Sequence, residues 1–332
     1  MINKARVIGT GSYLPKKVLS NFDLETMVDT TDEWIFTRTG MKERRIAAED
    51  EFPSDMGFEA AKIALADAHL TPLDIDLILV ATLAPDYIFP STACLIQAKL
   101  QAINAAAVDI QAACSGYLYA LSMAQAFVQS GVYRHVLVVA TEKLSSIVNY
   151  KDRSTCILFG DGAAACVVSN KGRGLLINNV CLGADGQFAD LLLQPAGGAR
   201  NPASFETVTA NQHYIHMGGN EIFKHAVRRM EFAAKECLER SGIREDQISW
   251  MIPHQANIRI IDAMAKRFQV PMEKVFLTLH KYGNTSASSV GIALDELLKS
   301  HQLKAGENLV LVAFGAGLTW GASVLTYGEA DE

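Results

Sequence analysis

The chain has 332 residues, of which 49% are hydrophobic and 20% are charged, and its formal net charge is −6. This length is enough to bury a large core in one or two globular domains. No apolar run reaches the roughly 18 residues of a membrane span, and residues 1–9 begin with a strand-like pattern instead of an apolar leader. We therefore expect a cytoplasmic protein with no membrane insertion and no nucleic-acid partner.

Two glycine-rich stretches resemble nucleotide-binding loops but lack the required pattern. Residues 9–14 open like a dinucleotide fingerprint, but Leu14 replaces the third glycine and Pro15 favours a loop over a helix start. Residues 160–165 precede an apolar run, which predicts a turn into a buried strand with close packing between layers. No P-loop is present. We expect no nucleotide site here and no cofactor.

Cys114 lies at a predicted strand-to-helix junction. The apolar run that ends near Ile110 indicates a buried strand, and the apolar spacing of residues 117–127 predicts a helix that ends at Ser130 and Gly131. The unpaired N–H groups and the positive end of the helix dipole favour the nucleophilic thiolate at such a position. Cys114 is therefore a candidate nucleophile, with a buried structural cysteine as the alternative.

Two later segments supply the usual companions of an activated cysteine. Residues 250–257 form a short apolar run that ends at His254, just before a helical pattern. Residues 282–289 form a turn of small polar residues that contains Asn284 and opens another helix. Both side chains thus stand at element ends, where catalytic groups concentrate in α/β folds because the strand fixes the backbone and the side chain faces a cleft.

The remaining cysteines and histidines show no metal-binding or disulfide framework. His213 and His216 are close in sequence, but no other ligand cluster accompanies them, so we expect no metal site. The cysteines form no C-x-x-C pair, sit mostly in apolar runs and fit free thiols in a reducing cytosol. They are Cys94, Cys114, Cys156, Cys166, Cys181 and Cys237.

The chain also repeats itself at about half its length. Leu65 recurs as Leu238, and residues 136–140 fall on residues 309–313, at the same offset of 173. Self-similarity at this period indicates two copies of one supersecondary unit, because a solenoid needs at least about three stacked repeats. We expect two related halves, residues 1–172 and residues 173–332.

The same offset makes a prediction about the site. It places Cys114 on Ala287, three residues after Asn284. Equivalent helix N-termini of the two halves would therefore meet, and the catalytic site would lie between them on a pseudo-two-fold axis.

The motifs around these residues carry a recognisable pattern. Cys114 lies in Ala-Ala-Cys-Ser-Gly, His254 in Pro-His-Gln-Ala-Asn and Asn284 in Gly-Asn-Thr-Ser-Ala. Together with the turn at 314–321 and the motifs Asp-Glu-Trp-Ile and Thr-Arg-Thr-Gly within 32–40, they resemble β-ketoacyl-ACP synthase III, which initiates type II fatty-acid synthesis. The resemblance spans nearly the whole chain. It implies an α/β thiolase-like fold with two pseudo-two-fold related halves in a five-layered α-β-α-β-α arrangement.

The implied reaction is the decarboxylative condensation of a short acyl-CoA, such as acetyl-CoA, with malonyl-ACP. It gives 3-oxoacyl-ACP, carbon dioxide and CoA through an acyl-Cys114 intermediate. Loss of carbon dioxide leaves an enolate and so avoids the need for a strong base. His254 and Asn284 would then serve as N–H donors to the thioester oxygen where negative charge develops.

Attack on a thioester also requires donors to the tetrahedral oxyanion. The Cys114 backbone N–H is one, and the turn at 314–317, whose small residues let a ligand approach, would supply the second. By resemblance the second donor is the middle residue of a triple-glycine turn, which is Ala316 in this chain.

The resemblance further implies a CoA site and a homodimer. Trp34 and Arg153 would stack on adenine with Arg38 near the nucleotide, although Ser154 replaces a common glycine. The pantetheine channel would be lined by Phe223, Ala256 and Asn257. Phe89 matches a position that reaches across the dimer to close the acyl pocket, and its bulky ring suggests a short primer.

A cluster of basic residues contrasts with the acidic chain. A local positive field can steer an acidic acyl carrier protein whatever the net charge, and a solvated helix face is the alternative. The residues are Lys224, Arg228, Arg259, Lys266 and Arg267.

Three other functions remain open on the sequence. The first is a related condensing or acyl-transfer enzyme of secondary metabolism with a different primer. The second is a cysteine hydrolase, which also uses cysteine, histidine and asparagine but exposes its thioester to water. The third is a degenerate scaffold, which the presence of all three catalytic residues disfavours. The primer itself depends on loops that include residues 183–217.

Overall fold

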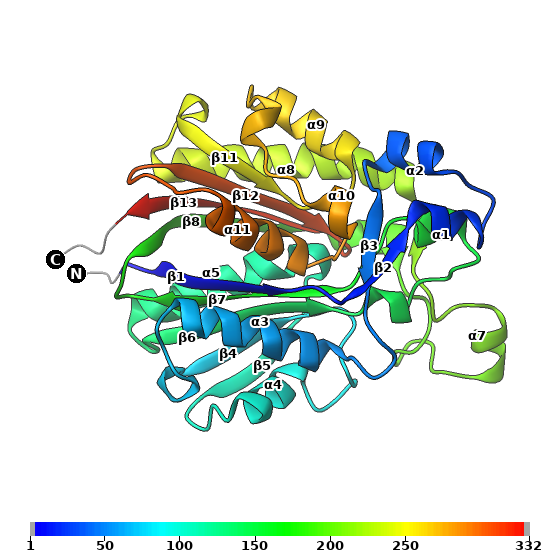
Figure 1. Cartoon of the computed structure of the whole chain (residues 1–332), viewed down its shortest axis with the longest axis horizontal. Helices are drawn as coiled ribbons and strands as arrows, with labels where there is room; N and C mark the ends of the chain where they lie inside the picture. Colours follow the sequence, from blue (N-terminus) through cyan, green and yellow to red (C-terminus); the bar gives the residue numbers. More distant parts are fainter. Residues whose placement is uncertain (1–3, 329–332) are drawn as a thin grey trace.

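The computed structural model describes residues 4–328. Its main feature is a nine-stranded mixed sheet with the order β11-β12-β13-β8-β1-β7-β6-β4-β5 (Figure 1). The strands of this sheet are β1 Arg6–Tyr13, β4 Leu77–Ala81, β5 Ala106–Ile110, β6 His135–Glu142, β7 Gly162–Ser169, β8 Gly174–Ala184, β11 Ile248–Pro253, β12 Asn308–Gly315 and β13 Thr319–Gly328.

Some helices cover the outer faces of the sheet, and others lie between its two groups of strands. The main ones are α3 Pro53–Asp67, α4 Thr92–Leu100, α5 Gly116–Ser130, α8 Gly219–Ser241, α9 Ile258–Arg267 and α11 Ser288–Ser300. The shorter helices and strands are β2 Lys17–Ser20, α1 Asn21–Glu25, α2 Asp32–Thr39, β3 Glu43–Ile46, α6 Arg153–Cys156, β9 Leu192–Leu193, α7 Phe205–Thr209, β10 His216–Met217 and α10 Leu279–Tyr282. The short 3₁₀ segments are η1 Pro72–Asp74, η2 Ala113–Ser115, η3 Leu144–Ser146, η4 Gly186–Leu191, η5 Glu245–Gln247 and η6 Met272–Lys274.

These elements form five layers. Helices α3 and α4 pack on the strands β1, β7, β6, β4 and β5, whereas α8 packs on β8, β13 and β12 and is joined by α9. Helices α5 and α11 contact strands of both groups and each other, so they lie between them (Figure 1). The predicted α-β-α-β-α arrangement is therefore confirmed.

The two central helices approach closely because small residues meet at their N-termini. A Cβ on Gly116 would lie 3.4 Å from the Ala287 Cβ, just before α11, and 3.0 Å from the Ala81 Cβ on β4. On α11, a Cβ at Gly291 would come within 2.6 Å of Ala164 on β7. The prediction that equivalent helix N-termini meet is confirmed, and this contact places the residues just before α5 beside those just before α11.

The internal repeat can be followed element by element. An offset of 173 carries β6 onto β12 along its full length, and it places α5 on α11 and β4 on β11 with small shifts at their ends. The expected boundary at 172/173 lies in the turn between β7 and β8.

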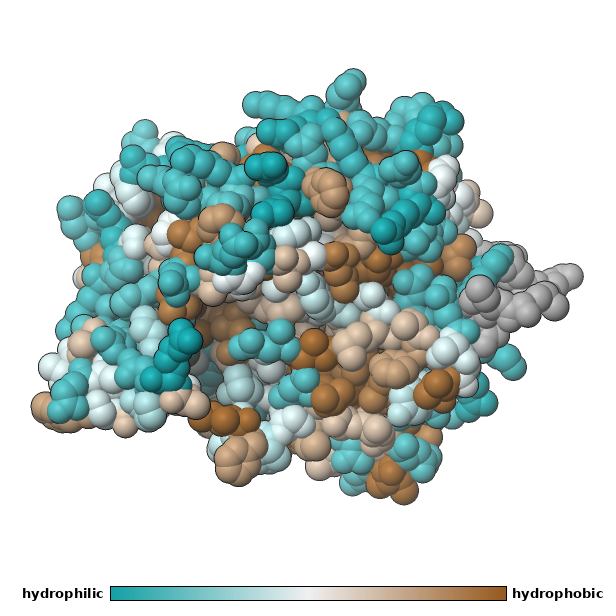
Figure 2. All heavy atoms as spheres, turned by 180° about the vertical axis from the view of Figure 1, so that it is seen from behind, coloured by the Kyte–Doolittle hydropathy of each residue, from teal (hydrophilic) through white to brown (hydrophobic). Residues whose placement is uncertain are grey.

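The strand before Cys114 differs from the prediction. β5 pairs only with β4, lies at the edge of the sheet, and leaves Val108 44% exposed. The expectation of a buried strand was wrong because an apolar run does not reveal whether a strand has one neighbour or two. Other large apolar side chains are also exposed, and Figure 2 shows apolar residues gathered over the lower half of the opposite face.

The glycine-rich stretch at 9–14 forms part of β1 and its end. A Cβ at Gly9 or Gly11 would lie within about 2.5 Å of the α3 backbone, so these glycines allow a strand and a helix to pack closely. None of the helices within residues 4–328 is long and apolar enough to cross a membrane. The same residues contain no group of three His, Cys, Asp or Glu side chains that could hold a metal ion, and all six cysteines are unpaired.

Candidate active site

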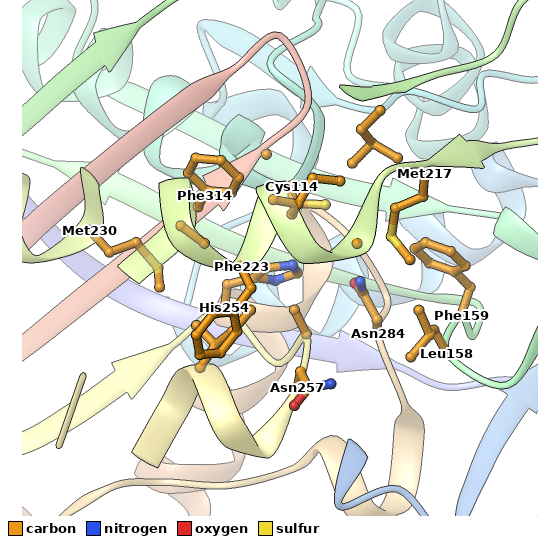
Figure 3. A pocket seen from close by; sticks show the side chains of 17 residues that line it. Cys114, Leu158, Phe159, Met217, Phe223, Met230, His254, Asn257, Asn284 and Phe314 are labelled. Carbon is orange, nitrogen blue, oxygen red and sulfur yellow. The ribbon is translucent and has the colours of Figure 1, made fainter. Parts of the chain in front are cut away.

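One pocket contains all three predicted catalytic side chains. It encloses about 820 Å³, including its open mouth, and Cys114, His254 and Asn284 face the same space (Figure 3). Cys114 comes from η2 just before α5, and Asn284 comes from the turn before α11, where the two central helices meet. His254 directly follows β11. The rest of the wall is mostly apolar.

Cys114 lies on η2, between the edge strand β5 and α5. Ala113 before it has a positive φ of 45°, a backbone conformation that is uncommon for residues other than glycine. The bend is held by the Ala112 carbonyl, which accepts from the Ser115 backbone N–H at 3.2 Å and from the Thr319 hydroxyl at 2.8 Å. A strand from the other half of the chain thereby anchors the turn that presents the thiol.

The environment of Cys114 does not favour the thiolate that its position before a helix predicts. Burial raises the pKa of the thiol to about 12, the Ser286 hydroxyl lowers it, and the charge of Glu142 raises it further. Removing a thiolate from water thus opposes the effect of the helix N-terminus. The thiol is therefore protonated at pH 7, so its proton must leave when it attacks.

His254 follows β11 and is held by two hydrogen bonds. Its backbone N–H donates to the Val312 carbonyl at 2.7 Å, and its Nδ1 lies 2.6 Å from the Ser289 hydroxyl. Because that hydroxyl accepts from the Gln255 backbone N–H at 3.4 Å, we assign it as the donor to Nδ1, which leaves the proton on Nε2. Burial lowers the pKa of His254 to about 4. The ring is therefore neutral at pH 7 and can donate from Nε2.

Asn284 is oriented by the turn that contains it. Its backbone N–H donates to the Leu158 carbonyl at 2.8 Å, and its carbonyl accepts from the Gly160 N–H at 3.0 Å. The side-chain Oδ1 accepts from the Ser286 backbone N–H at 2.8 Å, so the amide N–H₂ is the group that remains for the pocket. His254 and Asn284 thus both offer donors to one space.

The turn between β12 and β13 approaches the cysteine backbone closely. A Cβ on Gly315 would lie 2.7 Å from the Cys114 nitrogen, so no larger residue fits there without displacing the cysteine. Phe314 and Gly315 line the pocket, whereas Ala316, the expected second oxyanion donor, is half-buried and does not line it. Its carbonyl accepts from the Thr319 hydroxyl at 3.0 Å.

The residues expected along a channel are largely brought together. Phe223, Ala256 and Asn257 line the same pocket as the three catalytic candidates. Most other wall residues were not predicted, because apolar side chains in a sequence look the same whether they line a cavity or fill a core. They are Leu158, Phe159, Leu192, Met217, Ile222, Ala226, Met230 and Ile260.

Trp34, Arg38 and Arg153 form a separate stack. The Arg38 and Arg153 guanidinium carbons lie 4.1 Å and 4.8 Å from the centre of the Trp34 ring. Arg153 also donates to the Asp29 carbonyl at 2.7 Å. Trp34 packs in the same cluster as the pocket residues Leu158 and Leu192, which places the stack beside the pocket.

Phe89 lies apart from the pocket in this single chain. It is 84% exposed, and its neighbour Ile88 is 86% exposed. The residue precedes α4 and does not line the cavity that contains Cys114.

The predicted basic cluster lies on α8 and α9, and part of it is already paired. Lys224 pairs with Glu221 at 2.7 Å, and Arg267 pairs with Glu231 on the neighbouring helix. The other three are exposed and make no ion pair with any residue in the described range 4–328; they are Arg228, Arg259 and Lys266.

Sequence comparisons with known proteins agree with the geometry. Residues 108–186 match the family 3-oxoacyl-[acyl-carrier-protein (ACP)] synthase III, and residues 238–327 match the C-terminal part of that enzyme. The chain is 61% identical to a β-ketoacyl-[acyl-carrier-protein] synthase III of Chlamydia caviae over 325 residues, which cover 98% of this chain and 97% of that relative.

Solved structures share the fold over nearly the full length. The crystal structure of 3-oxoacyl-[acyl-carrier-protein] synthase III from Aquifex aeolicus VF5 has a TM-score of 0.88 at 50% identity and covers 97% of this chain and 100% of its own. The priming β-ketosynthase from the R1128 polyketide biosynthetic pathway has a TM-score of 0.90 at 37% identity, with 99% and 98% covered.

Proposed function

Because the chain belongs to the β-ketoacyl-ACP synthase III family, we propose that it initiates fatty-acid synthesis by condensing an acyl-CoA primer with malonyl-ACP. The observation that carries the proposal is the convergence of Cys114, His254 and Asn284 on one mostly apolar pocket. In the first half-reaction Cys114 attacks the primer thioester and CoA leaves. In the second, malonyl-ACP loses carbon dioxide, and the resulting enolate displaces the acyl group from Cys114 as 3-oxoacyl-ACP.

The geometry suits each step. The Cys114 N–H at the start of the α5 region and a donor from the turn at 315–317, with Ala316 as the candidate, would stabilise the oxyanion. A neutral His254 Nε2–H and the Asn284 amide would donate to the enolate oxygen. Each such donor is worth about 3–4 kcal/mol in the transition state of comparable sites.

The same pocket argues against the rival functions. A cysteine hydrolase must admit water to its thioester, whereas this wall is mostly apolar. The polyketide priming enzyme is 37% identical, against 61% for the fatty-acid relative from Chlamydia caviae. A role in fatty-acid synthesis is therefore favoured over secondary metabolism.

Intact-protein mass spectrometry after incubation with acetyl-CoA and longer or branched acyl-CoAs tests the proposal. The mass added to the chain identifies the primer. The proposal fails if no acyl-CoA adds an acyl group, or if the acyl-enzyme releases no 3-oxoacyl product with malonyl-ACP.

The stack of Trp34, Arg38 and Arg153 is the proposed site of the CoA adenine. With adenine between them, the Trp34 ring and the Arg153 guanidinium would lie about 7 Å apart, since each stacking contact needs about 3.5 Å. Arg153 at 4.8 Å must therefore move away from Trp34 before adenine can lie between them. Phe223, Ala256 and Asn257 would then contact pantetheine in the pocket.

We further propose a cytoplasmic homodimer in which Phe89 of each subunit closes the acyl pocket of the other. Support comes from the unpaired outer edge of β5 and from the exposed Ile88, Phe89 and Val108, since such apolar surface usually has a partner. The two halves, 1–172 and 173–332, would be the repeated units of each subunit.

Phe89→Ala is expected to broaden the primer range toward longer acyl-CoAs by enlarging the shared pocket. The same mass-spectrometric panel measures it, and analytical ultracentrifugation of the wild type should give twice the 36.0 kDa chain mass. Phe205→Ala is a matched control, because Phe205 is equally exposed, at 84%, but lies on α7. A monomeric wild type, or an unchanged primer range in a dimeric Phe89→Ala variant, would contradict this arrangement.

The unpaired basic residues on α8 and α9 are the proposed docking patch for the acyl carrier protein. Arg259→Glu or Lys266→Glu should weaken condensation with malonyl-ACP, and more so at low ionic strength, where the Debye length of about 10 Å or more leaves surface fields unscreened. Acylation by acyl-CoA should barely change. Arg240→Glu is a matched control, since Arg240 lies at the far end of α8 and pairs with Glu236. Steady-state rates with malonyl-ACP at several salt concentrations test this proposal. Rates that do not depend on salt would contradict it and would mean that these residues form only a solvated helix face.

A further inference from the structure

A buried carboxyl group lies behind the nucleophile and has no assigned role. Glu142 ends β6, is fully buried, and makes no ion pair with any residue from 4 to 328. Its neighbour Lys143 points elsewhere, donating to the Ala48 and Glu51 carbonyls at 2.7 Å. Burying an unpaired acid costs free energy unless it is protonated or well hydrogen-bonded, so its retention in an apolar strand suggests a function.

The hydrogen bonds of Glu142 fix its carboxyl group but leave one of the two oxygens able to accept another. Its Oε2 accepts from the Thr82 hydroxyl at 3.2 Å and from the backbone N–H groups of Leu83 at 3.1 Å and Ala84 at 3.3 Å. Its Oε1 receives only the longer Leu83 contact of 3.3 Å. One carboxylate oxygen therefore has remaining capacity to accept a proton.

Ser286 lies near Cys114 and Glu142, because a Cβ on Gly116 of α5 would lie 3.4 Å from the Cβ of Ala287 and 3.0 Å from that of Ala81, the residue before the Glu142 partner Thr82. It is fully buried with a positive φ of 51°, and its backbone N–H is occupied by Asn284. Its hydroxyl completes no hydrogen bond with any other described residue. Yet this hydroxyl is near enough to lower the pKa of both the Cys114 thiol and the Glu142 carboxyl, against the larger opposite effect of burial. A buried hydroxyl with no fixed partner between two titratable groups is suited to pass a proton.

We propose that Glu142 is the proton acceptor for the Cys114 thiol, with the Ser286 hydroxyl as the bridge. This inference rests on the acyl-transfer role of Cys114. As the sulfur bonds to the primer carbonyl, its proton moves to the Ser286 oxygen, and the Ser286 hydroxyl proton moves to the Glu142 carboxylate. CoA leaves as a thiolate and takes a proton from solvent. When the enolate later breaks the C–Sγ bond, the proton returns from Glu142 to the Cys114 sulfur.

The electrostatics fit this exchange. Burial raises the pKa of Glu142 to about 7, against the lowering effect of the Leu83 and Ala84 backbone N–H groups and of the nearby Ser286 and Thr82 hydroxyls. A general base is most effective when its pKa lies near the working pH. Cys114 is the titratable group that faces Glu142, and the charge of Glu142 raises the pKa of the thiol, so moving the proton to Glu142 also removes a charge that opposes the thiolate. His254 is the other titratable group lining the pocket and is neutral because burial lowers its pKa to about 4.

The test compares Glu142→Gln and Ser286→Ala with the wild type. The first replaces the acceptor by a neutral group of the same size, and the second removes the bridge but keeps the backbone N–H that holds Asn284. Acylation by acetyl-CoA and alkylation of Cys114 by iodoacetamide are measured from about pH 5 to 9. In the wild type both rates should fall as the pH drops through about 7, because Glu142 becomes protonated and can no longer accept. Both variants should lose this fall in rate near pH 7 and should react about 100-fold more slowly than the wild type at neutral pH.

Thr82→Val is the matched control, because it removes one hydrogen bond from the same carboxyl without interrupting the bridge. Because the lost bond lowers the pKa of Glu142, this variant should keep the wild-type fall in rate but show it at a higher pH. An unchanged profile in Glu142→Gln, or the same loss in Thr82→Val, would overturn the proposal. Should acetyl-CoA fail to acylate even the wild type, the proposed function is wrong, and the iodoacetamide profile still tests the proton path on its own.

Discussion

Cys114→Ser should abolish acyl-enzyme formation from acyl-CoA while leaving the protein folded. Serine is close to cysteine in size, so the η2 bend and its bonds to the Ala112 carbonyl can be kept. A hydroxyl is far harder to ionise than a thiol, and burial already opposes the anion at this position. We expect a loss of at least about 10³-fold in the rate of acylation, as for removal of other nucleophiles. Intact-protein mass spectrometry measures it directly.

Cys94→Ser is the matched control because Cys94 is an exposed free thiol on α4, away from the pocket. It should be acylated at the wild-type rate, with an unchanged melting temperature. Wild-type acylation of the Cys114→Ser variant would mean that another group is the nucleophile, and the proposed reaction would have to be rebuilt around that group.

The three candidate catalytic side chains could be picked out from the sequence because each stands where a sequence pattern changes. Cys114 and Asn284 precede helices, and His254 follows a strand, so the apolar periodicity marks their positions. The internal offset of 173 added that the two helix starts would meet, since it links Cys114 to Ala287. That step depends only on the two halves having similar folds, and it needed no knowledge of side-chain contacts.

The remaining features depend on contacts that no local pattern encodes. The exposure of β5 is set by the lack of a second neighbouring strand, and the high pKa of Cys114 is set by burial from several elements. Ser286 and Ser289 look like ordinary turn and helix-start residues, yet one orients Asn284 and the other His254. Glu142 did carry a sequence signal, because a lone acid ends an otherwise apolar strand.

Asn284→Asp should reduce decarboxylation of malonyl-ACP more than it reduces acylation by acyl-CoA. Aspartate has the same size and can still accept from the Ser286 N–H, so the turn is kept. It replaces the N–H₂ group that faces the pocket by an oxygen, which repels the developing enolate. We expect carbon dioxide release to fall by about 10²–10³-fold, as for loss of one oxyanion donor. Release of carbon dioxide and formation of the acyl-enzyme are measured separately.

His254→Ala is the companion to this variant and separates two roles for the imidazole. Because burial lowers the pKa of His254 to about 4, the ring is already in its neutral, donating form at pH 7, and its loss should again affect decarboxylation first. Equal loss of both half-reactions would show that His254 also takes the thiol proton. In that case the acylation rate of the wild type should hold down to about pH 4, whereas a path through Glu142 requires it to fall near pH 7. The pH at which acylation fails therefore identifies which buried group receives the proton of Cys114.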